Sequence, residues 1–198
     1  MIGKAGRPLI VAFMLTGVLP AHPKAALAPT AAQTQAGESG NDNSVDFELR
    51  RFRDASRSLQ DALAIATKLH PGARVVDASF DGQANPAVFR VKTLRGGRIF
   101  EDAIDASAGQ STGGSIESSL SEFGEEERRV LVALDAVRQE MTDAIIVAER
   151  NTDGRAISGS LQRLDGRLNF VIVTVAGDDL KQVILEPPVT KSERRQSR

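Results

Sequence analysis

The stretch 61-DALAIATKLHPGARVV-76 and the later stretch 143-DAIIVAERNTDGRAIS-158 place the same kinds of residue in the same order. Each begins with Asp-Ala, continues with apolar residues at helical spacing, and reaches a glycine before an extended apolar run. A period of 3.6 that changes to a period of 2 across a glycine indicates a helix, a turn and a strand. The sequence therefore predicts the same helix-to-strand passage twice, 82 positions apart.

Both predicted helices have an apolar stripe and a stop signal. Ser58 and Asp61 have the spacing of a capping box at the start of the first helix. Pro71-Gly72 ends the first helix, and Asp153-Gly154 ends the second. The first stripe consists of Leu59, Ala62, Leu63, Ala66 and Leu69, and the second of Met141, Ala144, Ile145 and Ala148.

Three strands are predicted after each helix, because short alternating apolar runs are separated by glycine-containing turns. They are residues 74–80, 87–93 and 98–105 in the first block, and 156–163, 168–175 and 180–186 in the second. The offset falls from 82 in the helices to 81 from Phe89 and Phe170 onward, which predicts the loss of one residue in a hairpin. The predicted fold class is α+β, a tandem repeat of one helix packed on a three-stranded antiparallel sheet.

An extra amphipathic helix is predicted between the repeats, over residues 125–139. Val130, Ala133, Leu134 and Val137 lie on one stripe of this helix. Acidic residues crowd its N-terminus, where the helix dipole favours negative charge. Such a helix needs a surface against which its stripe can pack.

The N-terminal residues have the pattern of a targeting segment. Lys4 and Arg7 precede the apolar run 8–19, which is too short to span a bilayer and is followed by small residues. Residues 1–28 are therefore predicted to be a secretory signal peptide, with cleavage between Ala21 and Ala32. The mature protein is expected to be periplasmic or secreted.

Composition sets the other predicted boundaries. Residues 29–45 are predicted to be a flexible linker and residues 111–122 a second linker, since both are polar and offer little to bury. Residues 46–110 form the first predicted repeat, and residues 123–188 hold the extra helix and the second repeat. The basic tail 189–198 is predicted to be disordered, and its charge allows weak contact with an anionic membrane.

Several features are shared by the two blocks and carry a family resemblance. They are the Asp-Ala starts at residues 61 and 143, Gly72 and Gly154 before the first strand, Phe89-Arg-Val and Phe170-Val-Ile in the middle strand, and the closing Asp105-Ala-Ser-Ala-Gly109. Each block thereby resembles a PepSY domain, although the second ends in Glu186-Pro-Pro. The resemblance implies an exported, non-enzymatic module. Such domains occur in protease propeptides and small envelope proteins, for which inhibition or regulation of a partner has been proposed.

The residue inventory offers little for catalysis. Cysteine is absent, and His70 is the only histidine after the targeting segment, so no Ser-His-Asp or Cys-His set is assembled from the sequence. His70 stands at the C-terminal end of a helix and is interpreted as a cap-region residue rather than a general base. Residues 42–46 have calcium-loop spacing at three positions but lack the required glycine and late glutamate. No catalytic residue, metal or cofactor is predicted.

The middle strand of the second block provides the candidate interaction face. Arg90 and Lys92 occupy one face of this strand in the first block, whereas the second block has Val171 and Val173 there, followed by Val175. A strand that is apolar on both faces is typical of one that is covered on both sides. The cover is expected to be the stripe at 130–137, the other repeat, or a partner chain.

Two functions are consistent with these patterns. The favoured hypothesis is an exported binding or regulatory module that modulates a periplasmic protease or a membrane sensor. It would dock an envelope protein or peptide segment on a sheet edge or sheet face. The alternative is a structural envelope protein that self-associates as a homo-oligomer through Val171–Val175. Nucleic acid is not an expected partner, because the formal net charge is −1 and Trp and Tyr are absent.

Overall fold

The computed structural model describes residues 39–188, with side chains from residue 44 onward. The predicted signal peptide 1–28, residues 29–38 of the first linker and the tail 189–198 lie outside the described residues. The helices are α1 (Ser39–Arg53), α2 (Leu59–Leu69), α3 (Glu125–Ala133) and α4 (Met141–Thr152). The strands are β1 (Arg74–Asp81), β2 (Val88–Arg95), β3 (Arg98–Asp105), β4 (Ile116–Ser119), β5 (Arg155–Leu164), β6 (Arg167–Ala176) and β7 (Asp179–Leu185).

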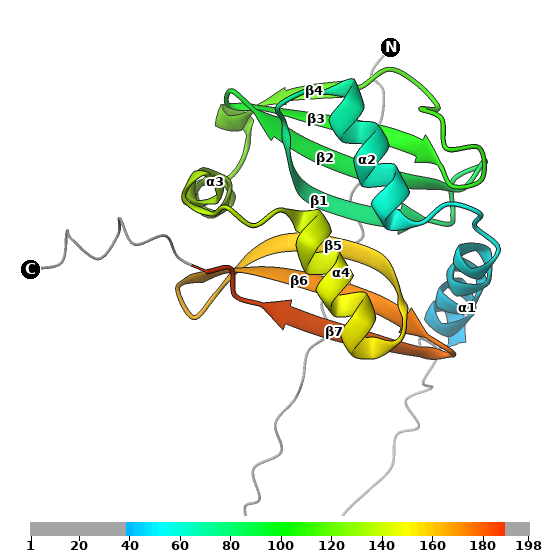
Figure 1. Cartoon of the computed structure of the whole chain (residues 1–198). Helices are drawn as coiled ribbons and strands as arrows, with labels where there is room; N and C mark the ends of the chain where they lie inside the picture. Colours follow the sequence, from blue (N-terminus) through cyan, green and yellow to red (C-terminus); the bar gives the residue numbers. More distant parts are fainter. Residues whose placement is uncertain (1–38, 189–198) are drawn as a thin grey trace, which may run out of the picture. The chain divides into compact units, whose positions relative to one another are not determined.

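All seven strands belong to one antiparallel sheet, in the order β4-β3-β2-β1-β5-β6-β7. Helices α2 and α4 lie side by side on the same face of this sheet (Figure 1). The Gln60 amide donates to Glu149 Oε2 at 2.5 Å and so links the two helices. The α+β class predicted from the sequence is confirmed, and the two predicted three-stranded sheets are joined edge to edge into one.

Two motifs make up most of the sheet, α2–β1–β2–β3 (the first motif) and α4–β5–β6–β7 (the second motif). Their strands pair in the same register at an offset of 81, since Ala78 pairs with Val91 as Gly159 pairs with Ile172. A register shift at Val76 recurs at the equivalent Ile157. The two motifs therefore agree in register wherever both are paired, and β5 and β6 continue for two further pairs.

The predicted loss of a residue in a hairpin is wrong. The 81 offset already holds at Arg74 and Arg155, where the first strands begin, while Gly72 and Gly154 still differ by 82. The missing residue therefore lies in the turn between helix and strand, at the position of Ala73. A turn on the surface accepts a deletion there without disturbing any strand register.

The two motif helices begin with the same kind of N-terminal capping interaction. Ser58 Oγ accepts a hydrogen bond from the Asp61 backbone N–H, and the Asp61 carboxylate accepts one from the Ser58 backbone N–H. This confirms the predicted capping box of α2. In α4 the Asp143 carboxylate accepts the Glu140 backbone N–H in the same way. Beneath the helices lies one continuous apolar core that both motifs share.

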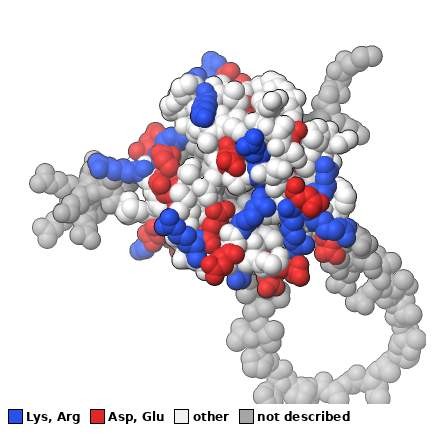
Figure 2. All heavy atoms as spheres, turned by 45° about the vertical axis from the view of Figure 1, so that its right-hand side comes forward, with Lys and Arg blue, Asp and Glu red and all other residues white. Residues whose placement is uncertain are grey.

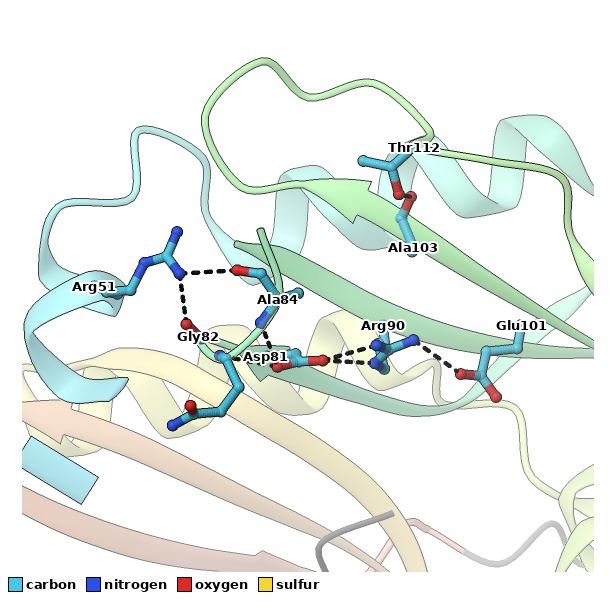
Figure 3. A network of polar contacts seen from close by, with 9 residues as sticks. Arg51, Asp81, Gly82, Ala84, Arg90, Glu101, Ala103 and Thr112 are labelled. Atoms are coloured by element: carbon cyan, nitrogen blue, oxygen red, sulfur yellow. Dashed lines mark hydrogen bonds and ion pairs between the residues drawn. The ribbon is translucent and has the colours of Figure 1, made fainter. Parts of the chain in front are cut away.

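Helix α1 precedes the first motif and contributes to the core. It begins at Ser39, inside the stretch expected to be a flexible linker, and includes residues 42–46. Its Phe52 packs edge-on against Phe80 at a centroid distance of 5.3 Å and against Phe89 at 6.5 Å. Arg51 donates to the Gly82 and Ala84 carbonyls at 2.7 and 2.8 Å (Figure 3). These contacts fasten α1 to the first hairpin.

Residues 111–122, expected to be a linker, contain ordered structure. Strand β4 pairs with β3, and Thr112 donates its backbone N–H to the Ala103 carbonyl, with its hydroxyl close to the same oxygen (Figure 3). A 3₁₀ turn at Leu120–Glu122 follows. The segment is ordered by backbone hydrogen bonds to the β3 edge, which its polar composition does not indicate.

Helix α3 is shorter than the predicted 125–139 and ends in a 3₁₀ turn at Leu134–Ala136. Leu131 and Leu134 are its buried residues, and Leu131 was missing from the predicted stripe. The Arg74 guanidinium donates to the Leu134, Val137 and Gln139 carbonyls and satisfies the end of this helix. Val130 and Leu131 face β1 and β5, around a small cavity of about 100 Å³ that is also lined by Val76 and Leu161.

Candidate functional site

Strand β6 is apolar on both faces, as predicted. Phe170, Ile172 and Thr174 are fully buried on the face that α4 covers. Because side chains alternate along a strand, Val171, Val173 and Val175 lie on the opposite face. Val171 is 4% exposed, Val175 is also buried, and Val173 is half-buried.

Strand β7 extends this apolar face to the edge of the sheet. Leu180 lies opposite Val175, and Ile184 lies opposite Val171. Directly opposite residues share a face of the sheet, so the five side chains form one surface. Leu180 is 47% exposed and Ile184 is 51% exposed. We call Val171, Val173, Val175, Leu180 and Ile184 the valine face.

The same face of the first motif is polar. Arg90 donates from Nε and Nη2 to Asp81 Oδ2, at 2.9 and 2.8 Å, and its Nη1 lies 3.7 Å from Glu101 (Figure 3). The sheet face that is turned away from α2 and α4 thus changes from ion-paired in β1–β3 to apolar in β6–β7. Elsewhere on the surface, Lys and Arg are interspersed with Asp and Glu, as Figure 2 shows for one side of the molecule.

Asp77 lies on β1 near the middle of the sheet, opposite Lys92 and Ser160. Burial raises the pKa of Asp77, and the negative charges of Glu101 and Glu127 act in the same direction, whereas Lys92 opposes them. A raised folded-state pKa means that Asp77 favours the fold when protonated. That contribution is complete below about pH 4, the ordinary range of an aspartate, and is lost as the pH rises through the folded-state pKa.

Replacing Asp77 with asparagine is therefore expected to stabilise the protein at neutral pH, with a gain that shrinks toward acid. Urea unfolding from about pH 3 to about pH 7 measures this. The matched control is Asp61→Asn, because hydrogen bonds from Ser58 lower the pKa of Asp61. That variant should lose stability at neutral pH, with the loss vanishing in acid. An Asp77→Asn variant that follows the wild-type pH dependence throughout would contradict this account.

A buried polar cluster joins the C-terminal end of α2 to β3. His70 Nε2 lies 2.9 Å from Asp102 Oδ2 and 3.0 Å from Ser115 Oγ, and Ser115 Oγ also contacts Asp102 Oδ1. The His70 ring stacks on Phe100 at a centroid distance of 4.3 Å. His70 is the C-cap residue of α2, as the sequence predicted.

The geometry of this cluster differs from that of a Ser-His-Asp triad. In a triad the carboxylate orients one imidazole nitrogen while the other nitrogen takes the serine proton. Here Asp102 and Ser115 both contact Nε2, so the arrangement provides no such relay. The sequence contained a signal for Asp102, because it takes an inward position between Phe100 and Ile104 on β3.

A surface hollow of about 470 Å³ lies where α1 meets the second motif and is lined by Phe52, Arg155 and Val175, among others. Arg155 stacks over the Phe52 ring at 5.0 Å, and Arg53 pairs with Asp178 at 2.9 Å. Both arginines are thus used in fastening α1 to β5 and to the β6–β7 turn. Within residues 44–188, no group of three or more His, Cys, Asp or Glu side chains is placed to hold a metal ion.

Comparison with known families adds to this geometry. Residues 58–110 match the family described as "Peptidase propeptide and YPEB domain", abbreviated PepSY. The chain carries a PepSY domain. This PepSY domain spans α2, β1, β2 and β3, about a quarter of the chain, and confirms the family resemblance of the first block. Helix α1 and the second motif lie outside the match, so the second PepSY domain stays a prediction.

Beyond the PepSY domain the comparisons are sparse. A crystal structure of a "putative lipoprotein" from Clostridium difficile 630 aligns with 69% of this chain and 95% of that chain. Its sequence identity is 16% and its TM-score is 0.38. No curated protein matches the chain. Among the described helices, none is both long and apolar enough to cross a bilayer.

Proposed function

We propose that this protein is an exported, non-catalytic binding module that regulates an envelope partner by docking it on the valine face. The family that residues 58–110 match takes part of its description from peptidase propeptides. The proposed setting is the periplasm or the exterior, after removal of residues 1–28. The proposed partner class is a peptidase or a membrane sensor.

The exposure of Leu180 and Ile184 beside the valines of β6 is the observation that carries the proposal. Contiguous exposed apolar surface on a soluble protein marks sites of interaction. The equivalent face of the first motif is occupied by the Asp81–Arg90–Glu101 ion pairs. The contiguous apolar surface of β6 and β7 thus lies at one end of this sheet face, separated by β1–β3 from the exposed Ile116 of β4 at the other end.

The equal registers of the two motifs support a further element of the proposal, that residues 123–188 include a second, diverged PepSY domain. The shared register shift at Val76 and Ile157 and the shared capping geometry at Asp61 and Asp143 belong to positions that are equivalent in the sequence. In this proposal the first domain keeps a polar face and supplies stability, while the second has acquired the docking surface.

The protein beginning at residue 29 is expected to retain a partner from periplasmic extract and to lower the activity of a retained peptidase. Immobilised protein and mass spectrometry of the eluate identify the partner, and hydrolysis of a casein substrate measures inhibition. Lysine at Val173 and Ile184 should abolish retention, because a charge on an apolar contact surface must be desolvated.

The control for this experiment is Gln162→Lys, which places the same charge at an exposed position on the same sheet face. It should retain the partner as the wild type does. Identical eluates from the wild type and from the Val173→Lys/Ile184→Lys variant would show that the valine face is not the docking site.

A further inference from the structure

We infer that the free edge of β7 pairs with β7 of a second copy of this chain, antiparallel and centred on Gln182. The two copies then share one continuous sheet, and their valine faces become a single surface. This inference goes beyond the proposed function, because it concerns the purified protein alone and does not require the envelope partner.

The first observation is that the outer edge of the first motif is covered by a strand, whereas the equivalent edge of the second motif is not. Strand β7 is the counterpart of β3, since Leu94 pairs with Ile99 as Val175 pairs with Leu180. The outer edge of β3 is covered by the antiparallel strand β4. No strand within residues 39–188 covers the outer edge of β7, which ends the sheet. An uncovered edge presents unpaired backbone N–H and C=O groups and is a template for another strand.

The second observation is that the β7 sequence is complementary to itself. In an antiparallel pair centred on Gln182, Leu180 of one copy lies opposite Ile184 of the other, and Gln182 lies opposite Gln182. Leu180, Gln182 and Ile184 occupy the same sheet face. Leu180 and Ile184 are the two most exposed apolar side chains of β7. In this pair each Leu180 would contact the Ile184 of the other copy, and the two Gln182 side chains would lie opposite each other between these two contacts.

The third observation is that the chain already uses this mode of association. Strands β1 and β5 join the two motifs by antiparallel edge pairing, in which Ala78 lies opposite Gly159. These residues are equivalent positions at the 81 offset, so the junction has the symmetry of a two-fold axis. Pairing of β7 with β7 repeats the same junction at the other edge of the second motif.

The charged groups around β7 do not oppose the pairing. Lys181 Nζ is directed back toward α4, where it donates to the Thr152 carbonyl at 3.3 Å. Asp178 pairs with Arg53, and Glu186 pairs with Arg167, both at the ends of the strand. Each of these charged groups interacts with a residue of its own chain. The side chains at the middle of the proposed pair are therefore Leu180, Gln182 and Ile184.

The experiment uses the exported protein and a cysteine at the centre of the proposed pair. The chain has no cysteine, so Gln182→Cys introduces the only thiol. Directly opposite residues of antiparallel strands have Cα atoms about 4.5–5.5 Å apart, within the range of a disulfide. Under mild oxidation Gln182→Cys should form a covalent dimer, whereas the control Ser118→Cys, on the β4 edge, should stay monomeric.

Sedimentation velocity over a concentration series tests the same pairing without cysteine. The wild type should show a reversible dimer, and Leu180→Lys/Ile184→Lys should raise the dissociation constant by about tenfold or more, since lysines would lie opposite lysines. Circular dichroism should be unchanged, because both side chains are exposed.

Three results would each overturn the inference. The first is a wild type that stays monomeric while Gln182→Cys crosslinks no faster than Ser118→Cys. The second is a dimer that Leu180→Lys/Ile184→Lys leaves intact, which places the contact elsewhere. The third is a dimer that appears only after removal of residues 189–198, which assigns the edge to the tail of the same chain. Partner retention by a strictly monomeric protein would leave the proposed function standing, so the two failures can be distinguished.

Discussion

Replacing His70 with leucine is expected to lower the free energy of unfolding by about 1–3 kcal/mol, the usual cost of leaving a buried polar group without its partner. The Asp102 side chain is fully buried, and His70 is 9% exposed. Without the imidazole, the carboxylate retains only the Ser115 hydroxyl, which cannot compensate for the loss of hydration. Urea unfolding at neutral pH measures the loss.

A double variant makes this prediction specific. His70→Leu/Asp102→Leu removes the carboxyl group together with its partner, and replacing both partners of a buried polar pair with apolar side chains is commonly neutral or stabilising. The double variant should therefore be more stable than His70→Leu alone, by about 1 kcal/mol or more. Glu101→Leu is the control, because Glu101 faces outward on β3 and takes part in a partly exposed ion pair worth less than about 1 kcal/mol. A double variant as unstable as His70→Leu would disprove the role given to the pair.

Replacing Phe52 with alanine is expected to cost about 3–5 kcal/mol, as for other fully buried phenylalanines. Phe52 is 1% exposed and packs against the rings of Phe80 and Phe89 and beneath the Arg155 guanidinium. It lies outside residues 58–110, so this variant tests whether the PepSY domain of this chain depends on a helix that precedes it.

Phe47→Ala is the matched control for Phe52→Ala. Both residues belong to α1, and Phe52 is buried whereas Phe47 is 41% exposed. Its truncation should cost less than about 1 kcal/mol, since a surface change removes little packing. Chemical denaturation of both variants decides the point. Equal losses of stability for Phe52→Ala and Phe47→Ala would mean that the Phe52 ring contributes no more to core packing than the exposed Phe47 ring does.

The motif helices and strands could be predicted because their burial follows a fixed period. The stripe from Leu59 to Ala66 and the alternation around Phe89 and Phe170 are local properties of the sequence. Stop signals such as Pro71-Gly72 fixed the ends of the elements within one or two residues. The apolar second face of β6 could be predicted from the same alternation, because Val171 stands at the position equivalent to the charged Arg90 of β2.

The elements that were missed depend on contacts between distant residues. Strand β4 has only four residues, Ile116–Ser119, and is held by the backbone of β3. The start of helix α1 falls in a polar stretch expected to be linker, and the helix is held by Phe52 and Arg51, whose partners lie in the first hairpin. The join between β1 and β5 is a pairing of edges, which no periodicity within either strand specifies.

The packing at the β1–β5 junction also differs between the two halves of the core. A Cβ atom at Gly159 would lie 3.0 Å from Met141 Sδ and from Ile172 Cδ1. The equivalent positions of Gly159, Met141 and Ile172 in the first half hold Ala78, Leu59 and Val91. If the second motif is a diverged repeat of the first, as proposed, it has lost the methyl group of an alanine at the β1–β5 junction and gained longer side chains, Met141 and Ile172, that fill the space. In a dimer of identical subunits, any substitution in the core appears in both halves. In a single chain that contains both halves, core side chains can change in one half while the other half keeps its packing.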